Sequence, residues 1–313
     1  MGKSGFVAII GRPNAGKSTL LNAILGAPIS IVTPKAQTTR ERVLGILTEN
    51  GNQMVFVDTP GIHRAKHGGI NAYMMSEARE ALEEPSMVWY LLDPSSAVQH
   101  EEAVLELLKG RKAPVFLLLN KTDVIRGNEW REKSENFLKD MAAKLTEMGN
   151  TVAQTLSISA VEGEGLETLL TESWKRLPEG PLYYPDEEQL SDRPMRFFAA
   201  EKIREQLLMQ LGEEIPYACA VEIQKFEEPN PKDAKPMTRI EAVIHVERDS
   251  QKGMVIGKGG KKIKDIGQAA REKIQEFMGG GPIFLGLQVK VYKDWTRDAE
   301  ALKRMGYHLP VSK

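Results

Sequence analysis

Between residues 11 and 18 the chain reads Gly11-Arg12-Pro13-Asn14-Ala15-Gly16-Lys17-Ser18, then Thr19, and fits the pattern G-x-x-x-x-G-K-[ST]. An apolar run over 6–10 precedes it and a helical pattern over 17–25 continues from it. At such a junction glycines let backbone N–H groups turn inward around phosphate oxygens, and the helix dipole adds positive potential. This context favours a phosphate-binding loop over a purely structural glycine turn. Lys17 would pair with β- and γ-phosphates, and the Ser18 hydroxyl would bind Mg²⁺.

From this loop to about residue 177, short apolar runs alternate with helical patterns. The expected strands are 6–10, 42–48, 53–58, 87–93, 114–120 and 152–157, and the expected helices are 17–25, 72–82, 99–109, 129–148 and 166–177. Strands that are apolar on both faces and alternate with helices predict a mostly parallel sheet covered by helices. The turn signal Glu49-Asn50-Gly51-Asn52 predicts one antiparallel hairpin at the edge of that sheet.

Composition limits the class of protein. A length of 313 residues suggests two domains, and 42 basic against 43 acidic residues give a formal net charge of -1. Nucleic-acid affinity would therefore need a local basic patch. Cys219 is the only cysteine, which excludes a disulfide scaffold and a cysteine-based zinc site. No apolar run approaches the ~18 residues that span a bilayer, and no signal-peptide pattern is present, so we expect a cytoplasmic protein.

Asp58-Thr59-Pro60-Gly61 ends an expected strand and fits D-x-x-G. Alone the pattern is common and is satisfied by a plain turn. Downstream of a phosphate loop it makes Asp58 a second-shell or water-mediated partner of Mg²⁺, and it places the Gly61 N–H near a γ-phosphate. The next residue is Ile62, where Ras-like enzymes carry a glutamine that orients the attacking water. We therefore expect slow intrinsic hydrolysis.

Asn120-Lys121-Thr122-Asp123 follows an apolar strand and fits N-K-x-D. A carboxylate there can accept two parallel hydrogen bonds from guanine, whereas adenine lacks that donor pair and would leave Asp123 unpaired. Lys121 would pack its stem along the base plane. Ser159-Ala160, after the last strand, can present a backbone N–H to guanine O6. The alternative for Asp123 is an ordinary helix cap.

These motifs, in this order, closely resemble the GTPase domain of the translation-factor class. The resemblance implies a switch threonine that closes over Mg²⁺, and Thr39 in the segment Thr38-Thr39-Arg40 stands where a T-T-R switch belongs. Many relatives have glycine before the threonine pair, whereas this chain has Gln37. The residues expected to act in catalysis are then Lys17, Thr39 and Gly61, with Ser18 and Thr39 on the metal. Asn14 resembles the position that helps to hold K⁺ in some related GTPases.

Residues 177–194 read LPEGPLYYPDEEQLSDRP and break the alternation. We assign 1–178 to the first domain, 179–194 to a linker and 195–313 to a second domain with a C-terminal tail. That domain shows a helix over 195–211, strands over 218–226 and 238–246, two helices joined by glycines near 257–260, and a strand over 286–292. The order α-β-β-α-α-β predicts a small α+β domain.

The glycine junction in the second domain reads Val255-Ile256-Gly257-Lys258-Gly259-Gly260-Lys261-Lys262-Ile263-Lys264-Asp265-Ile266 and fits V-I-G-x-x-G-x-x-I-x-x-I. It resembles a KH domain, and the element order matches the prokaryotic type II topology. The glycines would admit a nucleic-acid backbone in a groove for about four nucleotides of single-stranded RNA. The residues expected to bind RNA are Ile256, Gly257, Lys258, Gly259, Gly260, Lys261, Lys262 and Lys264. No aromatic residue is interleaved, which argues against stacking. The alternative is a solvated basic helix.

A GTPase domain, a linker and a C-terminal KH domain together resemble the Era family of bacterial GTPases over essentially the whole chain. The resemblance implies an α/β P-loop GTPase domain with a mixed, mostly parallel sheet, followed by a small α+β type II KH domain. It also implies GTP/GDP and Mg²⁺ as cofactors, with K⁺ a further candidate. The implied partners are the 3′ end of 16S rRNA and the 30S subunit precursor, with peripheral contact at the inner membrane, no DNA, and a monomeric state. Two alternatives stay open: an RNA-binding module with a structural nucleotide, and an ATPase or small-molecule kinase.

Overall fold

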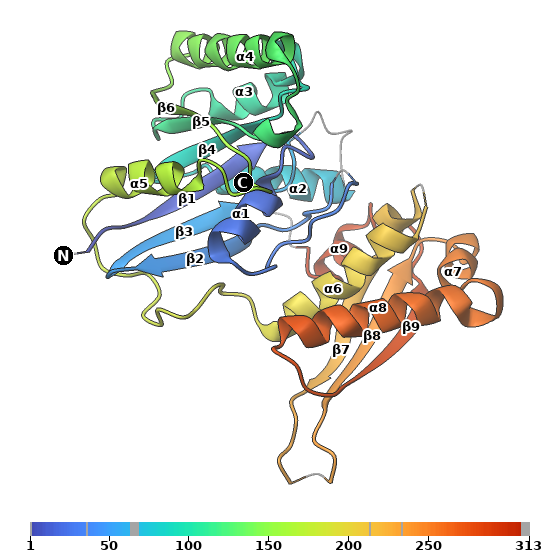
Figure 1. Cartoon of the computed structure of the whole chain (residues 1–313). Helices are drawn as coiled ribbons and strands as arrows, with labels where there is room; N and C mark the ends of the chain where they lie inside the picture. Colours follow the sequence, from blue (N-terminus) through green and yellow to red (C-terminus); the bar gives the residue numbers. More distant parts are fainter. Residues whose placement is uncertain (1, 36, 63–68, 213, 233, 308–313) are drawn as a thin grey trace. The chain divides into compact units, whose positions relative to one another are not determined.

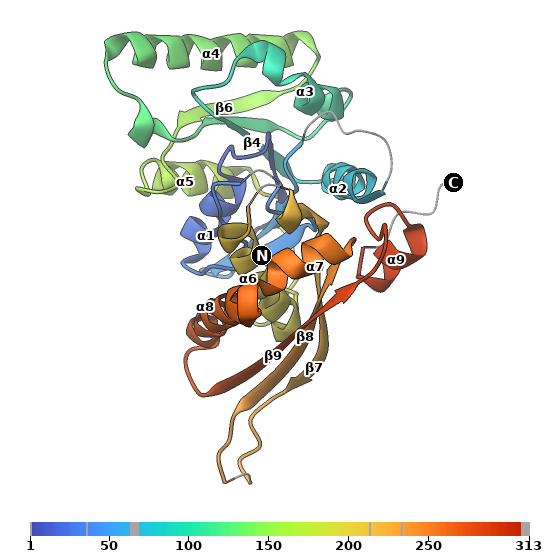
Figure 2. The same ribbon diagram turned by 90° about the vertical axis from the view of Figure 1, so that its right-hand side faces the viewer.

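In the computed structural model, residues 2–35, 37–62, 69–212, 214–232 and 234–307 are described. The chain forms two compact units, the first built mainly from residues up to Asp192 and the second mainly from Arg193 onward. Each unit has its own sheet (Figures 1 and 2). Among the described residues, no helix is both long enough and apolar enough to cross a membrane.

The first unit is a six-stranded sheet with the order β2-β3-β1-β4-β5-β6. Its strands are β1 (Ser4–Gly11), β2 (Val43–Glu49), β3 (Asn52–Asp58), β4 (Met87–Leu92), β5 (Val115–Leu119) and β6 (Val152–Ser157). All neighbours are parallel except β2 and β3, which pair antiparallel. Asn50 and Gly51 between them have φ of 51° and 71°, as a two-residue hairpin turn of type I′ requires. The mixed, mostly parallel sheet and its edge hairpin are thus confirmed.

Helices cover both faces of this sheet. They are α1 (Lys17–Leu25), α2 (Gly69–Glu80), α3 (Glu102–Leu108), α4 (Asn128–Glu147) and α5 (Leu166–Arg176). Helices α2, α3 and α4 share one apolar core with alternate residues of β1, β4 and β5. On the opposite face, Leu21 and Leu25 of α1 pack against Gly45 of β2, and the Trp89 indole of β4 donates to Ser173 Oγ of α5 at 3.2 Å. This sandwich fixes the carboxyl ends of the parallel strands, where the predicted loops emerge.

The proline-rich segment after α5 is hydrogen-bonded to the edge of the sheet. The buried Gln53 side chain accepts from the N–H groups of Tyr183 and Tyr184 at 2.8 and 3.0 Å, and its amide donates to the Tyr184 carbonyl at 2.8 Å. Farther along, the Leu190 carbonyl accepts from Ile46 N–H at 2.9 Å, and Ser191 Oγ donates to the Leu44 carbonyl at 2.6 Å. The expected linker therefore covers the exposed edge of β2 up to residue 191.

The second unit is a three-stranded sheet with helices on it. Its elements are α6 (Met195–Gln210), β7 (Ala220–Glu227), β8 (Thr238–Val246), α7 (Asp249–Ile256), α8 (Lys261–Phe277), β9 (Ile283–Val291) and α9 (Ala299–Arg304). Strand β8 is central, antiparallel to β7 and parallel to β9. Helices α6 and α8 lie side by side on the sheet (Figure 1), and Ile203, Leu207, Ile266 and Ile274 fill the core beneath them.

Two features of this unit differ from the sequence expectation. Strand β9 begins at Ile283 instead of residue 286, so that Gly286 lies within the strand, and a short helix, α9, occupies part of the expected tail. The Asp298 side chain caps α9 by accepting from Ala301 N–H at 2.7 Å. The order α-β-β-α-α-β is otherwise as predicted.

Candidate nucleotide and RNA sites

The phosphate loop joins β1 to α1 at the carboxyl edge of the sheet. Gly16 has φ of 95°, and a Cβ placed there would come within 2.2 Å of Asn120 Nδ2, so the position requires glycine. The Lys17 ammonium bridges the loop by donating to the carbonyls of Gly11 at 3.2 Å and Arg12 at 3.0 Å. Burial lowers the pKa of Lys17 to about 8, although the nearby Asp58 and Glu101 carboxylates oppose the shift. Lys17 is therefore held in the loop with little solvation.

Three oxygen-bearing side chains meet beside Lys17. Ser18 Oγ donates to Asp58 Oδ2 at 2.7 Å and lies 3.0 Å from Thr39 Oγ1. Burial raises the pKa of Asp58, against the opposing effect of the Lys17 ammonium. Asp58 Oδ1 is buried and accepts no hydrogen bond from any residue that the structure describes. Hydroxyl and carboxylate oxygens are the ligands that Mg²⁺ prefers, and an unpartnered buried oxygen suits a metal-bound water, so these residues fit the ion.

The D-x-x-G segment lies against the phosphate loop. A Cβ on Gly61 would come within 2.6 Å of Pro13 Cα, and Ile62 N–H donates to the Gly11 carbonyl at 3.1 Å. Thr59 Oγ1 donates to the Ile9 carbonyl at 2.8 Å, which ties the buried Thr59-Pro60 pair to β1. The Ile62 side chain is 1 % exposed and belongs to the apolar core under α2. Contact of Ile62 with a nucleotide would therefore come through its backbone. Residues 63–68, which follow Ile62 and include His63, lie outside the described residues.

A buried polar network supports the loop, and the sequence motifs did not reveal it. The Arg12 guanidinium donates to Ser96 Oγ at 2.9 Å, and Ser96 donates to Glu101 Oε1 at 2.7 Å. The other carboxylate oxygen, Glu101 Oε2, accepts from the Tyr90 hydroxyl at 2.7 Å. Arg12 is thus anchored to the segment that follows β4. Neither Ser96 nor Glu101 belongs to a phosphate-loop motif, which is why spacing alone could not find them.

The N-K-x-D segment is tied to both neighbouring loops. Asn120 Nδ2 donates to the Ala15 carbonyl at 2.9 Å, and Asn120 Oδ1 accepts from Ala160 N–H at 3.0 Å. Ser159 Oγ donates to Asp123 Oδ1 at 2.6 Å, which orients that carboxylate. Thr122 N–H donates to the Ile158 carbonyl at 3.2 Å. The structure thus brings the predicted base-reading residues together with the phosphate loop.

Lys121 is fixed by a residue that the motifs did not include. Its Nζ lies 2.6 Å from Asp93 Oδ2, and its φ of 62° is unusual for a side-chain-bearing residue. Burial raises the pKa of Asp93, but hydrogen bonds from Lys121 and Ser95 outweigh this effect and leave the pKa below its ordinary value. Asp93 follows β4 directly, so the end of that strand is the signal that could have identified it.

The predicted RNA-binding segment forms the end of α7, a glycine turn and the start of α8. Lys258, Lys261 and Lys264 are exposed, whereas Lys262 is half-buried and its Nζ lies 3.3 Å from the Gln210 carbonyl at the end of α6. Ile256 is half-buried. Three of the four expected lysines are therefore exposed to solvent, and Lys262 is partly engaged in the fold.

A groove of about 500 Å³ runs between α8 and the edge strand β9. Its apolar floor includes Ile263, Leu285 and Leu287, and Lys264 and Arg271 stand on the α8 side. Phe284, which is 47 % exposed, lines the same groove. The basic segment itself lacks an aromatic residue, but β9 supplies one, so the argument against stacking does not extend to the groove. Sequence reasoning missed Phe284 because it started the last strand at residue 286, three residues after its observed start at Ile283.

A phosphate loop, D-x-x-G and N-K-x-D segments at the carboxyl edge of a mixed sheet, followed by a type II KH unit, define a P-loop GTPase with an RNA-binding domain. A family model described as a 50S ribosome-binding GTPase matches residues 6–121, and a KH domain model matches residues 214–296. A curated protein named GTPase Era from Staphylococcus haemolyticus (strain JCSC1435) is 43% identical over 306 residues, which are 97% of each chain.

Two solved structures extend the similarity to three dimensions. Aquifex aeolicus Era, crystallised as a variant bound to GDP.AlF4-, is 36% identical with a TM-score of 0.89, over 98% of this chain and 100% of that one. Era in complex with MgGDPNP and nucleotides 1506-1542 of 16S ribosomal RNA is also 36% identical, with a TM-score of 0.90 over 99% and 100%. The chain belongs to the Era family of GTPases.

Proposed function

We propose that the chain is a slow GTPase switch whose KH domain binds single-stranded RNA near the 3′ end of 16S rRNA during assembly of the 30S subunit. The observation that carries the nucleotide half is the cluster of Ser18, Thr39 and Asp58 oxygens within hydrogen-bond distance of one another beside Lys17. The RNA half is supported by the basic glycine turn, the adjoining groove and the rRNA-bound relative.

The reaction is transfer of the γ-phosphoryl group to water, in which the chain's own groups position and stabilise charge. Lys17, held by two loop carbonyls, would turn toward the β- and γ-phosphate oxygens and neutralise the charge that develops there. Ser18 and Thr39 would hold Mg²⁺ and Asp58 one of its waters; the bound ion would add Lewis-acid stabilisation. Because the Ile62 side chain lies in the core, no side chain at that position can orient the water, and slow turnover follows.

Guanine selectivity is proposed to depend on Asp123, oriented by Ser159. The Asn120 side chain connects the loop that holds Asp123 to the phosphate loop, so that base and phosphates are held in one register. We further propose that K⁺ stimulates hydrolysis through Asn14, on the strength of its position in the loop. Hydrolysis measured in KCl and in NaCl at equal ionic strength tests this, and equal rates would contradict it.

The nucleotide proposal is tested by steady-state hydrolysis of GTP, ATP and xanthosine triphosphate by the wild type and by Asp123→Asn. We expect the wild type to hydrolyse GTP in a Mg²⁺-dependent way. The variant should lose hydrolysis of GTP and gain hydrolysis of xanthosine triphosphate, because the xanthine O2 can accept a hydrogen bond from the asparagine amide. Equal use of ATP by the wild type would favour the alternative ATPase assignment. No turnover above background would favour an RNA-binding module with a structural nucleotide.

The RNA proposal is tested by the affinity for a short single strand carrying the 16S rRNA 3′ end, at one fixed salt concentration. We expect tighter binding with a non-hydrolysable GTP analogue than with GDP, because a switch requires a coupling free energy between its two sites. Equal affinity would show that the nucleotide does not gate this contact. The absence of binding in both states would refute the RNA assignment and leave the GTPase assignment intact.

A further inference from the structure

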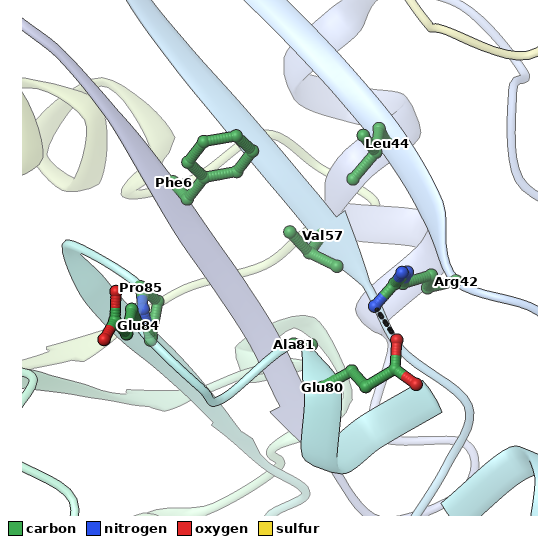
Figure 3. A pocket seen from close by; sticks show the side chains of 8 residues that line it. All are labelled: Phe6, Arg42, Leu44, Val57, Glu80, Ala81, Glu84 and Pro85. Carbon is green, nitrogen blue, oxygen red and sulfur yellow. Dashed lines mark ion pairs between the residues drawn. The ribbon is translucent and has the colours of Figure 1, made fainter. Parts of the chain in front are cut away.

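A pocket of about 260 Å³ opens on the first unit (Figure 3). Its floor crosses three neighbouring strands: Phe6 comes from β1, Leu44 from β2 and Val57 from β3, and Leu44 and Val57 are direct partners across the antiparallel pair. Ala81 and Pro85, just beyond α2, form the opposite wall. The pocket is thus an apolar hollow at the point where α2 ends and the sheet continues.

The rim of the pocket is charged, with an excess of negative charge. Arg42 Nη1 pairs with Glu80 at 2.7 Å (Figure 3). Arg42 Nε also lies 3.8 Å from Glu77. Glu84 also lines the rim, is exposed, and forms no hydrogen bond or ion pair with any residue that the structure describes. Arg42 is therefore already engaged by carboxylates, and Glu84 is left to attract an additional cation.

An exposed aromatic ring extends the apolar surface beside the pocket. Tyr183, on the segment that covers the sheet edge, lies with its ring centroid 4.7 Å from that of Phe6 and is 51 % exposed. Its backbone N–H is fixed by Gln53 at 2.8 Å, so the position of Tyr183 is set by the fold. Exposed, rigidly held aromatic residues are enriched where proteins bind one another.

We propose that this pocket, lined by Phe6, Leu44, Val57 and Glu84, is a docking site for a protein partner that inserts one aromatic or long apolar side chain flanked by lysine or arginine. The volume suits a single anchoring side chain and is below that of common metabolite sites, which span ~300–1,000 Å³. Unpaired negative charge at Glu84 selects a basic segment and repels phosphates, which disfavours RNA and anionic lipid at this face. None of these residues is assigned to the nucleotide or RNA sites.

The probe for the test is the peptide Ac-Lys-Trp-Lys-NH2, titrated into the GDP-bound full chain with methyl-labelled leucine and valine. The charge-reversed peptide Ac-Glu-Trp-Glu-NH2 and a uridine hexanucleotide serve as comparisons. We expect saturable NMR shifts of the Leu44 and Val57 methyl signals with the basic peptide alone. Equal shifts with the acidic peptide, shifts with the hexanucleotide, or no shift with any probe would each overturn the proposal.

The chain offers a matched pair of variants for the charge argument. Glu83 and Glu84 are adjacent and exposed, but only Glu84 lines the pocket. Glu84→Lys should weaken binding of Ac-Lys-Trp-Lys-NH2 about fivefold, as expected when one surface attraction becomes a repulsion, whereas Glu83→Lys should change it less than about twofold. An equal loss in both variants would mean that the peptide senses only the general surface charge, and the pocket assignment would be wrong.

Discussion

Replacing Asn120 with alanine should loosen the nucleotide site, because it breaks the bridge between the phosphate loop and the base-reading loop. The Asn120 side chain is 1 % exposed and bridges the Ala15 carbonyl of the phosphate loop and the Ala160 N–H of the base-reading loop. Alanine would leave both backbone groups buried without a partner. A buried unsatisfied polar group costs ~1–3 kcal/mol, so we expect the variant to lose about 2–4 kcal/mol of unfolding free energy.

The same loss should appear in nucleotide affinity, because GDP must then fix two loops that the wild type already holds together. If ~1.4 kcal/mol or more of the cost is carried into binding, affinity falls by about tenfold or more. Urea unfolding of the nucleotide-free chain, followed by tryptophan fluorescence, measures the first quantity. Titration with a fluorescent GDP analogue measures the second.

Asn150 provides the matched control. It is also a buried asparagine, and it joins the loop before β6 to the end of α3. Its Nδ2 donates to the carbonyls of Leu108 at 2.9 Å and Arg111 at 3.2 Å. Neither of these two segments contributes to the nucleotide site. Asn150→Ala should therefore destabilise the chain by a comparable amount and leave GDP affinity within about twofold. If both variants bind GDP as the wild type does, the bridge made by Asn120 is structural only and the reasoning is refuted.

Three further outcomes follow from the contacts. The pKa of Lys17 is about 8 in the fold against an unperturbed 10.5, so between these pH values the unfolded chain binds more protons than the folded chain. The free energy of unfolding of the nucleotide-free chain should therefore rise from pH 8 toward pH 10 by up to ~1.4 kcal/mol per pH unit. Urea unfolding at a series of pH values measures this slope, which the Lys17→Met variant should lack. Phe284→Ala should weaken single-stranded RNA binding by ~1–3 kcal/mol without changing the slope of log K against log salt concentration. Lys264→Ala should reduce that slope by about 0.7 in filter-binding titrations. The reverse pattern would contradict the assignment of the groove as the RNA site. Glu101→Ala should leave the Tyr90 hydroxyl unpaired and cost about 2 kcal/mol of stability by urea unfolding, and a neutral result would count against the network.

The elements predicted from sequence are those for which local pattern and tertiary role agree. The strand that ends at Gly11 and the helix that starts at Lys17 are marked by apolar runs on both sides of one glycine-rich loop, and the edge hairpin is marked by Asn50-Gly51. Where the local pattern and the fold disagree, the predicted boundary of an element is wrong. Gly286 suggested the start of a strand, but pairing with β8 from Thr238 onward extends β9 back to Ile283.

The residues of the candidate site also fall into two groups, those that sequence motifs predict and those that they do not. The residues proposed to bind the nucleotide, such as Lys17, Ser18 and Asp123, can be found in the sequence because their chemistry requires fixed neighbours along the chain. Residues that act by supporting them, such as Asp93 against Lys121 and Ser96 against Arg12, come from the ends of other strands. Their distances along the chain depend on the lengths of the connections, which the chemistry of the site does not constrain. These supporting residues can therefore be identified only when the order of the strands in the sheet is known.

The proline-rich segment shows why composition predicts the absence of regular structure better than the absence of contacts. Its prolines preclude a helix, which is why the sequence predicts a linker here. Yet Gln53, a single buried amide on β3, satisfies both N–H groups of Tyr183 and Tyr184, and Ile46 pairs with Leu190 farther along. An edge strand presents unpaired backbone groups that must be covered. An irregular segment can pair with these groups as well as another strand can. The predicted edge hairpin therefore implied that some segment must cover β2, but the sequence did not show which segment does so.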